Sequence, residues 1–101
     1  MHIKKRHIHE ALEEAALLFQ QGALQQARAV LAAILKADPR QAEALHLLGL
    51  LALKQGKPAE AESLLARAVK LAPQVAEFHN SLGVALRKQD KLGEAERYLA
   101  G

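Results

Sequence analysis

The sequence contains no cysteine and no tryptophan, and its 101 residues include only two phenylalanines and one tyrosine. The lack of cysteine excludes disulfide bonds and thiolate metal sites, and it leaves the redox compartment open. Because aromatic side chains are so few, a core has to be built mainly from leucine and alanine. Both are strong helix formers, so the composition predicts a single all-α domain.

Long apolar runs are also missing from the sequence. The longest, around Leu47 to Leu53, is far shorter than the roughly 20 residues that a membrane-spanning helix needs. The first residues are basic, like the head of a secretion signal, but Glu10, Glu13 and Glu14 interrupt the apolar segment that should follow. We therefore expect a cytoplasmic protein without a membrane partner.

The excess of positive charge is confined to the amino-terminal end. The formal net charge is +3, and Lys4, Lys5 and Arg6 account for it, because the remaining 11 of the 14 Lys and Arg balance the 11 Asp and Glu. No aromatic side chains that would stack on bases accompany them. We read residues 1–7 as a solvated basic tail and expect no nucleic-acid partner.

What the sequence does have is a repeat with a period of 34 residues. The residues that recur at this interval are Pro39 and Pro73, Gly22 and Gly56, Leu48 and Leu82, Gly49 and Gly83, Ala27, Ala61 and Ala95, and Leu31, Leu65 and Leu99. A fixed period of this size indicates stacked copies of one supersecondary unit. We place the units at about 8–41, 42–75 and 76–101, which together form the domain 8–101.

Each unit has the apolar spacing of two helices joined by a very short turn, which forces the helices to be antiparallel. The predicted helices span about 9–21, 24–37, 42–55 and 58–71, and two more start near residues 76 and 92. Gly22 and Gly56 suit a left-handed turn, and Asp90 takes their place in the third unit. Gly49 and Ala61 are small where two helices should cross closely.

The units resemble the tetratricopeptide repeat, whose pattern is W-x2-L-G-x2-Y, then A-x3-F, then P. The central unit matches with Leu45, Leu48, Gly49, Ala52, Ala61, Leu65 and Pro73. Every large aromatic residue of the pattern is replaced, in the third unit by His79, for which we expect a packing role. The resemblance implies a right-handed α-solenoid of antiparallel helix pairs, with about three repeats and the last one truncated.

The resemblance also implies a concave groove, lined by the first helix of each pair, that binds extended peptides or helices of a partner protein. Steps of three and four residues along those helices select His9, Leu12, Ala16, Phe19, Glu43, His46, Leu50, Leu53, Glu77, Asn80, Val84 and Arg87. An alternative is that Phe19, Leu50 and Leu53 only pack between helices.

Some members of the family bind chaperone tails by holding a peptide carboxylate with Lys, Asn and Arg. The corresponding places in this sequence carry Leu12, Ala16, Leu47, Glu77 and Ser81. This clamp is therefore absent, and the resemblance does not extend to acidic chaperone tails.

The sequence carries no pattern typical of catalysis or of a metal site. His7 and His9 point to different faces of a helix, whereas two ligands on one helix need a spacing of three or four. No serine or histidine is flanked like a nucleophile or its base, and there is no glycine-rich phosphate loop. We expect no catalytic residue, no metal, no cofactor and no small-molecule substrate.

The leading functional prediction is a non-enzymatic scaffold that binds a peptide or partner protein in the groove. A second hypothesis is self-association through the carboxyl-terminal end, where Leu92, Ala95 and Leu99 are expected to lack a covering helix. A third hypothesis is that the chain is the amino-terminal regulatory part of a larger bacterial transferase, such as a glycosyltransferase or sulfotransferase.

Overall fold

A computed structural model describes residues 3–99, except for the side chain of Leu99, and every regular element in this range is a helix. The elements are a short 3-10 helix η1 (Lys5–His7) followed by the α-helices α1 (Ile8–Gln20), α2 (Leu24–Ala37), α3 (Ala42–Lys54), α4 (Pro58–Leu71), α5 (Ala76–Arg87) and α6 (Leu92–Leu99). The described residues contain no strand, so the all-α prediction is confirmed.

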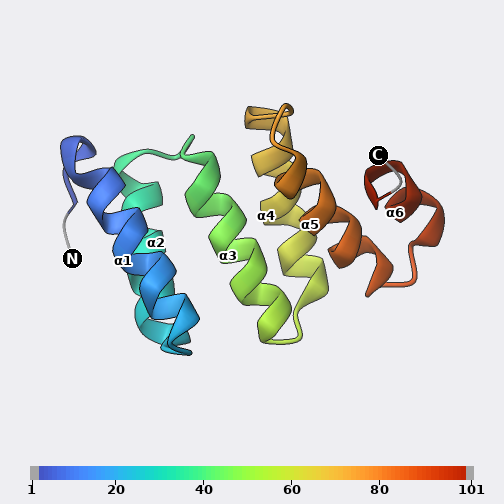
Figure 1. The fold of residues 1–101 in the computed structure, drawn as a ribbon, viewed down its shortest axis with the longest axis horizontal. Coiled ribbons are helices and arrows are strands. Elements are labelled where there is room, and N and C mark those ends of the chain that lie inside the picture. The colour runs from blue at the N-terminus through green and yellow to red at the C-terminus, as the bar shows by residue number, and fades with distance from the viewer. Residues whose placement is uncertain (1–2, 100–101) are drawn as a thin grey trace.

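The helices stand in a row along the longest axis of the molecule, with α1 and α2 at one end and α6 at the other (Figure 1). Helix α1 packs on α2, α3 on α4 and α5 on α6, while the α2–α3 and α4–α5 contacts join one pair to the next. The described chain measures 40 × 26 × 18 Å. This is the predicted solenoid of about three antiparallel helix pairs, in which each pair contacts only its neighbours.

The turn inside each pair has the same geometry in all three units. Gly22, Gly56 and Asp90 have positive φ angles of 79°, 73° and 62°. The amide of the next residue then donates to a carbonyl five positions earlier, from Ala23 to Leu18, from Lys57 to Ala52 and from Lys91 to Leu86, at 2.9, 2.9 and 3.0 Å. Such a bond satisfies carbonyls that the helix end leaves free. The turn prediction is confirmed, and Asp90 adopts the left-handed conformation without being a glycine.

Small residues recur where the helices of a pair cross. Ala27, Ala61 and Ala95 occupy equivalent places in the three units and are 0%, 0% and 2% exposed. Among the larger side chains, the most deeply buried are Leu31, Ile34, Leu45, Leu51 and Leu65. The buried residues form three core clusters, which contain Leu31, Leu65 and Leu45 respectively, and partly buried side chains such as Leu35 and Val69 each pack against two of them.

No helix among the described residues is both long enough and apolar enough to pass through a membrane.

Candidate functional site

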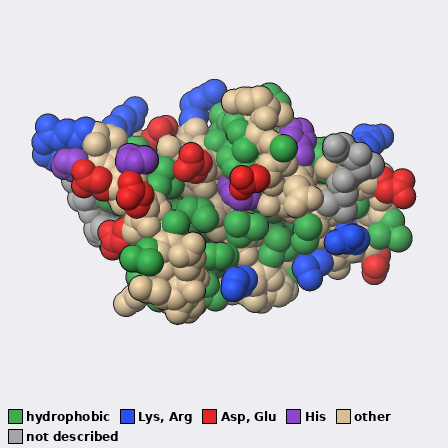
Figure 2. Space-filling model, in the orientation of Figure 1, with side chains coloured by type: hydrophobic (Ala, Val, Ile, Leu, Met, Phe, Trp, Pro, Cys, Tyr) green, Lys and Arg blue, Asp and Glu red, His purple; other side chains and the backbone are tan. Residues whose placement is uncertain are grey.

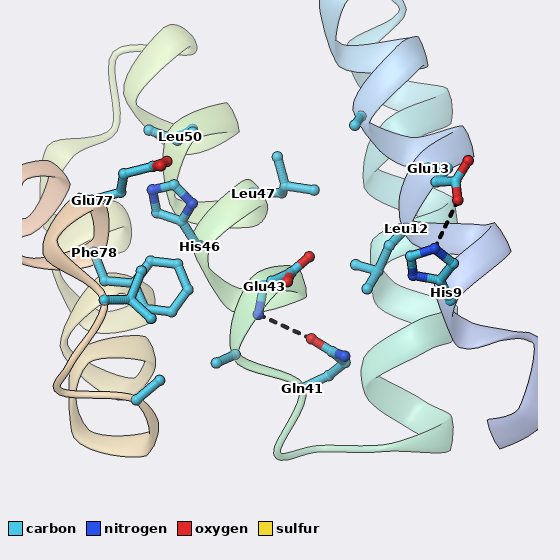
Figure 3. Close-up of a pocket in the computed structure, with 14 residues that line it drawn as sticks. His9, Leu12, Glu13, Gln41, Glu43, His46, Leu47, Leu50, Glu77 and Phe78 are labelled. Atoms are coloured by element: carbon cyan, nitrogen blue, oxygen red, sulfur yellow. Dashed lines mark hydrogen bonds and ion pairs between the residues drawn. The ribbon is translucent and has the colours of Figure 1, made fainter.

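A groove with a volume of about 690 Å³ lies between α1 and α3. Helix α1 packs mainly on α2, so its exposed side is only loosely joined to α3 and a gap stays open between them. The groove is lined by His9, Leu12, Glu13, Ala16, Gln41, Ala42, Glu43, His46, Leu47, Leu50, Ala72, Val75, Glu77 and Phe78 (Figure 3). These residues come from α1, from α3 and Gln41 just before it, from the first turn of α5 and from the connection that precedes α5.

The floor of the groove is apolar. Leu12 projects from α1 toward Leu47 on α3 (Figure 3), and Leu12 is only 6% exposed. Leu47 and Leu50 are half-buried, so part of each side chain faces solvent inside the groove. Because this apolar floor is partly exposed to solvent, covering it with a partner's apolar side chains is favourable.

The rim of the groove is polar and carries three carboxylates, those of Glu13, Glu43 and Glu77. On α1, the imidazole Nε2 of His9 lies 2.9 Å from a carboxylate oxygen of Glu13, and both side chains are well exposed. At the start of α3, the backbone amide of Glu43 donates a hydrogen bond of 3.0 Å to the side-chain oxygen of Gln41. This cap fixes the first turn of α3, and with it the position of Glu43 at the rim.

His46 ties α3 to α5 beside the groove. Its Nε2 atom lies 2.8 Å from the hydroxyl oxygen of Ser81, and its ring centroid is 4.7 Å from that of Phe78. Burial lowers the pKa of His46, while the carboxylates of Glu77 and Glu43 act in the opposite direction. A neutral imidazole is therefore favoured near pH 7. At 9% exposure, His46 contributes mainly to packing and only an edge of its side chain borders the groove.

Seven of the sequence-selected residues line this groove, namely His9, Leu12, Ala16, Glu43, His46, Leu50 and Glu77. The other five, Phe19, Leu53, Asn80, Val84 and Arg87, do not. Phe19 is half-buried, with the Lys54 ammonium 5.3 Å from its ring centroid. Leu53 packs against the core cluster that contains Ala52 and Leu65, as the packing alternative anticipated. The hollow follows α1 and α3 and takes in only the first turn of α5.

Sequence reasoning missed Glu13, Gln41, Ala42, Leu47, Ala72, Val75 and Phe78. Two of them had a usable signal, because one face of a helix includes positions i, i+3, i+4 and i+7. Counted from His9 this stripe includes Glu13, and counted from Glu43 it includes Leu47. Ala72 and Val75 belong to a connection between helices, for which helical spacing gives no signal.

The carboxyl-terminal surface differs from its prediction. Leu92 is 56% exposed, as an uncovered position would be, but Ala95 is 2% exposed and packs in the core of this chain. The expectation that Ala95 lies on an open face was therefore wrong, because the small side chain lies at the close crossing of α5 and α6. The side chain of Leu99 is outside the described residues.

His79 packs as expected, half-buried beside α6. Its Nε2 donates a hydrogen bond of 2.7 Å to the carbonyl oxygen of Pro73, and its ring lies 5.9 Å from that of Tyr98 in a stacked arrangement. Across the part of the chain that the structure describes, no three His, Asp or Glu residues are grouped closely enough to hold a metal ion.

Comparisons with known proteins agree with this geometry. A family model described as the tetratricopeptide repeat matches residues 12–73 and 46–101. No curated protein sequence matches the chain.

Solved structures with a similar fold cover nearly the whole chain. The second tetratricopeptide repeat domain of Spaghetti (RPAP3), bound to the HSP90 peptide SRMEEVD, has a TM-score of 0.89 and 22% identity, covering 95% of this chain and 89% of that one. MamA from Desulfovibrio magneticus RS-1 has a TM-score of 0.83 and 26% identity, covering 93% of this chain and 53% of that one. An O-GlcNAc transferase mutant from Thermobaculum terrenum has a TM-score of 0.80 and 31% identity, covering 97% of this chain but 20% of that one. The chain thus spans about half of MamA and a fifth of the transferase.

Proposed function

Because the chain belongs to the tetratricopeptide repeat family, we propose that it is a non-catalytic interaction module whose α1–α3 groove binds a peptide segment of a partner protein. The observation that carries the proposal is the combination of an apolar floor at Leu12, Leu47 and Leu50 with an open, polar rim. The volume of about 690 Å³ lies within the range of roughly 300–1,000 Å³ that is usual for binding clefts. That it does so in the cytoplasm stays a prediction.

The structural neighbour that holds an HSP90 peptide supports a peptide as the class of ligand. It does not support the same peptide. SRMEEVD contains two glutamates and an aspartate, whereas the charged residues of this groove other than histidine are Glu13, Glu43 and Glu77. Like charges on a peptide and its site weaken binding, so a different peptide sequence is required.

The proposal can be tested with a random peptide library displayed on phage. We expect selected peptides to bind the chain, and Leu50→Glu to abolish that binding by placing a charge on the groove floor. Leu17→Glu is the matched control, because Leu17 is a leucine on α1 that is 54% exposed and does not line the groove. Circular dichroism checks that each variant is folded.

A second groove variant guards against unfolding of Leu50→Glu. Ala16→Phe fills the groove from α1, where the alanine is only half-buried, without adding a charge. Selected peptides that bind Ala16→Phe and a folded Leu50→Glu with unchanged affinity would place binding outside this groove.

We also propose that residues 1–7 are accessory to the binding domain 8–101. The tail is not wholly detached, since Ile3 packs against the core cluster that contains Ile8 and Leu31. Deleting residues 1–7 should therefore lower the melting temperature while leaving peptide affinity unchanged. A loss of affinity in a folded truncated chain would make the tail part of the site.

Self-association is a second candidate function, favoured by the exposure of Leu92 at the carboxyl-terminal end. Light scattering at increasing concentration should then show a dimer that Leu92→Glu abolishes. A strict monomer at high concentration would exclude it.

A role as the repeat segment of a longer transferase is favoured by the similarity to the Thermobaculum terrenum enzyme, of which this chain spans a fifth. Sequencing the whole open reading frame tests this candidate function, because it requires a transferase domain encoded downstream in the same frame.

A further inference from the structure

We propose that the α1–α3 groove selects cationic partner segments, in which lysine or arginine residues stand beside apolar anchors. This inference rests on the proposed function and specifies the chemistry of the peptide. Its basis is that three of the groove-lining side chains are carboxylates, while no lysine and no arginine lines the groove.

The three carboxylates come from three helices and border one apolar surface. Figure 3 shows Glu13 on α1, Glu43 at the start of α3 and Glu77 beside His46, with Leu47 and Leu12 between them. In the space-filling view, acidic side chains follow one edge of the apolar patch, while basic side chains lie along the opposite edge and also beyond the acidic edge, at the end of the molecule that holds α1 (Figure 2). An apolar surface with an acidic edge is complementary to a segment that has both leucine-like and basic residues.

The carboxylates of Glu43 and Glu77 are available to a partner. Within residues 3–98 neither side chain forms an ion pair, and both residues are exposed. Glu13 contacts His9, which also lines the groove and is exposed. A lysine or arginine of the partner can therefore reach all three carboxylates without breaking a buried contact.

Helix electrostatics explain only part of this arrangement. Glu43 and Glu77 lie in the first turns of α3 and α5, where a carboxylate complements the positive end of the helix dipole. That end carries only about half an elementary charge, so a carboxylate there leaves the region negative. Glu13 lies in the middle of α1, where no dipole requires a negative charge. The groove thus has a net negative charge that capping does not account for.

The charge of the groove is opposite to that of the chain, whose formal net charge is +3. Attraction by overall charge alone would favour an acidic peptide, whereas the groove favours a basic one. The two sources of preference therefore give opposite results in a binding experiment.

The experiment uses three fluorescent synthetic peptides that share their leucine positions and differ only in carrying lysine, glutamine or glutamate elsewhere. Anisotropy titrations with the full chain should show the lysine peptide binding at least about tenfold more tightly than the glutamate peptide. The difference should shrink as ionic strength rises from about 0.15 M to 1 M, because screening then acts within about 3 Å.

Charge-reversal variants locate the preference. The double variant Glu43→Lys, Glu77→Lys should weaken binding of the lysine peptide by about tenfold or more and strengthen that of the glutamate peptide. The matched control is Glu14→Lys, Glu96→Lys, which changes the net charge equally at exposed positions on α1 and α6 that do not line the groove. It should leave both affinities nearly unchanged. If lysine at the helix starts unfolds the chain, the neutral pair Glu43→Gln, Glu77→Gln replaces it, with a smaller expected loss.

The outcomes separate this inference from the proposed function. If the glutamate peptide binds at least as tightly as the lysine peptide and Leu50→Glu abolishes both, the groove binds peptides but the charge selection is refuted. If Glu14→Lys, Glu96→Lys weakens the lysine peptide as much as the groove variant does, only overall charge acts and the inference fails. If none of the three peptides binds at millimolar concentration, the inference fails. If, in addition, selected library peptides bind Leu50→Glu and Ala16→Phe with unchanged affinity, the proposed function fails as well.

Discussion

Gly49 of α3 and Leu65 of α4 meet so closely that a Cβ atom added to the glycine would lie 2.5 Å from Cγ of the leucine and 2.6 Å from its Cδ2. Leu65 is 0% exposed, so its side chain is held by neighbours and cannot simply turn away. The absence of a side chain at Gly49 therefore sets the distance between the two helices of the central pair.

Gly49→Ala should lower the free energy of unfolding by about 1–2 kcal/mol, because overpacking outweighs the gain of roughly 0.5–1 kcal/mol in helix propensity. Gly93→Ala is the matched control, since Gly93 lies in α6 and a Cβ there meets nothing within 4 Å. It should leave stability unchanged or raise it slightly. Urea unfolding measures both.

Adding Leu65→Ala tests the contact itself. The single variant Leu65→Ala should cost about 2–5 kcal/mol, and the double variant Gly49→Ala, Leu65→Ala should cost less than the sum of the two, because the new methyl occupies part of the cavity. If the two losses of unfolding free energy were strictly additive, the side chains at positions 49 and 65 would not be in energetically significant contact.

The turn residues provide a second prediction. Gly22 and Gly56 have positive φ and open space around them, so alanine there is strained by its backbone alone and should cost about 1–2 kcal/mol. Asp90 has the same conformation with a φ of 62°, and Asp90→Gly should raise stability by a few tenths to about 1 kcal/mol. Thermal melts decide the sign. A destabilised Asp90→Gly would mean that the aspartate side chain stabilises its turn.

The fold could be predicted because the local sequence of each unit indicates its two helices, the turn between them and the place where they cross closely. Gly56 indicates a left-handed turn and Ala61 a close crossing, and Asp90 and Ala95 occupy the equivalent positions 34 residues later. The period then implies the stacking. Even Ala95, for which the exposure was predicted wrongly, follows from this logic, since Ala27 and Ala61 in the same phase are fully buried.

The groove could be predicted only in part, because its extent depends on how successive pairs are rotated. Spacing along a helix selects a face, and it selected Leu12, Ala16, Glu43 and Leu50, all of which line the groove. It gives no information on whether a given length of that face is hollow or filled. Phe19 and Lys54 contact each other near the carboxyl ends of α1 and α3, and neither lines the groove.

The buried imidazole of His46 predicts a stability that falls on acidification. Because its pKa is lowered in the folded state, the unfolded chain binds the proton first, near the ordinary pKa of 6.5. The contribution of His46 is thus fully present above about pH 6.5 and is lost as the pH falls below it. The melting temperature should therefore decrease as the pH is lowered from about 7.5 to about 5.5.

The control removes the titrating group and its partner together. The variant His46→Leu, Ser81→Ala leaves no unpaired hydroxyl at this buried contact. Its melting temperature should change less over the same pH range than that of the parent. An equal change in both proteins would assign the pH dependence to other groups.

The last prediction concerns a second contact between units, in which the Glu62 carboxylate on α4 accepts hydrogen bonds from Gln89 at 2.8 Å and from Lys91 at 3.0 Å. These bonds, that from Lys91 first, lower the pKa of Glu62. Gln89 also donates to the carbonyl oxygen of Pro58, so one side chain holds the α5–α6 turn against the start of α4.

Gln89→Ala should therefore loosen α6 more than the rest of the chain. In a solenoid each pair is stabilised by its neighbours, and α6 has a neighbour only on one side among the described helices, whereas α3 and α4 are packed on both sides. Native-state hydrogen exchange should show the slowest amides in α3 and α4 and faster ones in α6, with Gln89→Ala accelerating α6 while leaving α3 unchanged. Acceleration by the same factor from α1 to α6 would mean that the chain opens only as one cooperative unit.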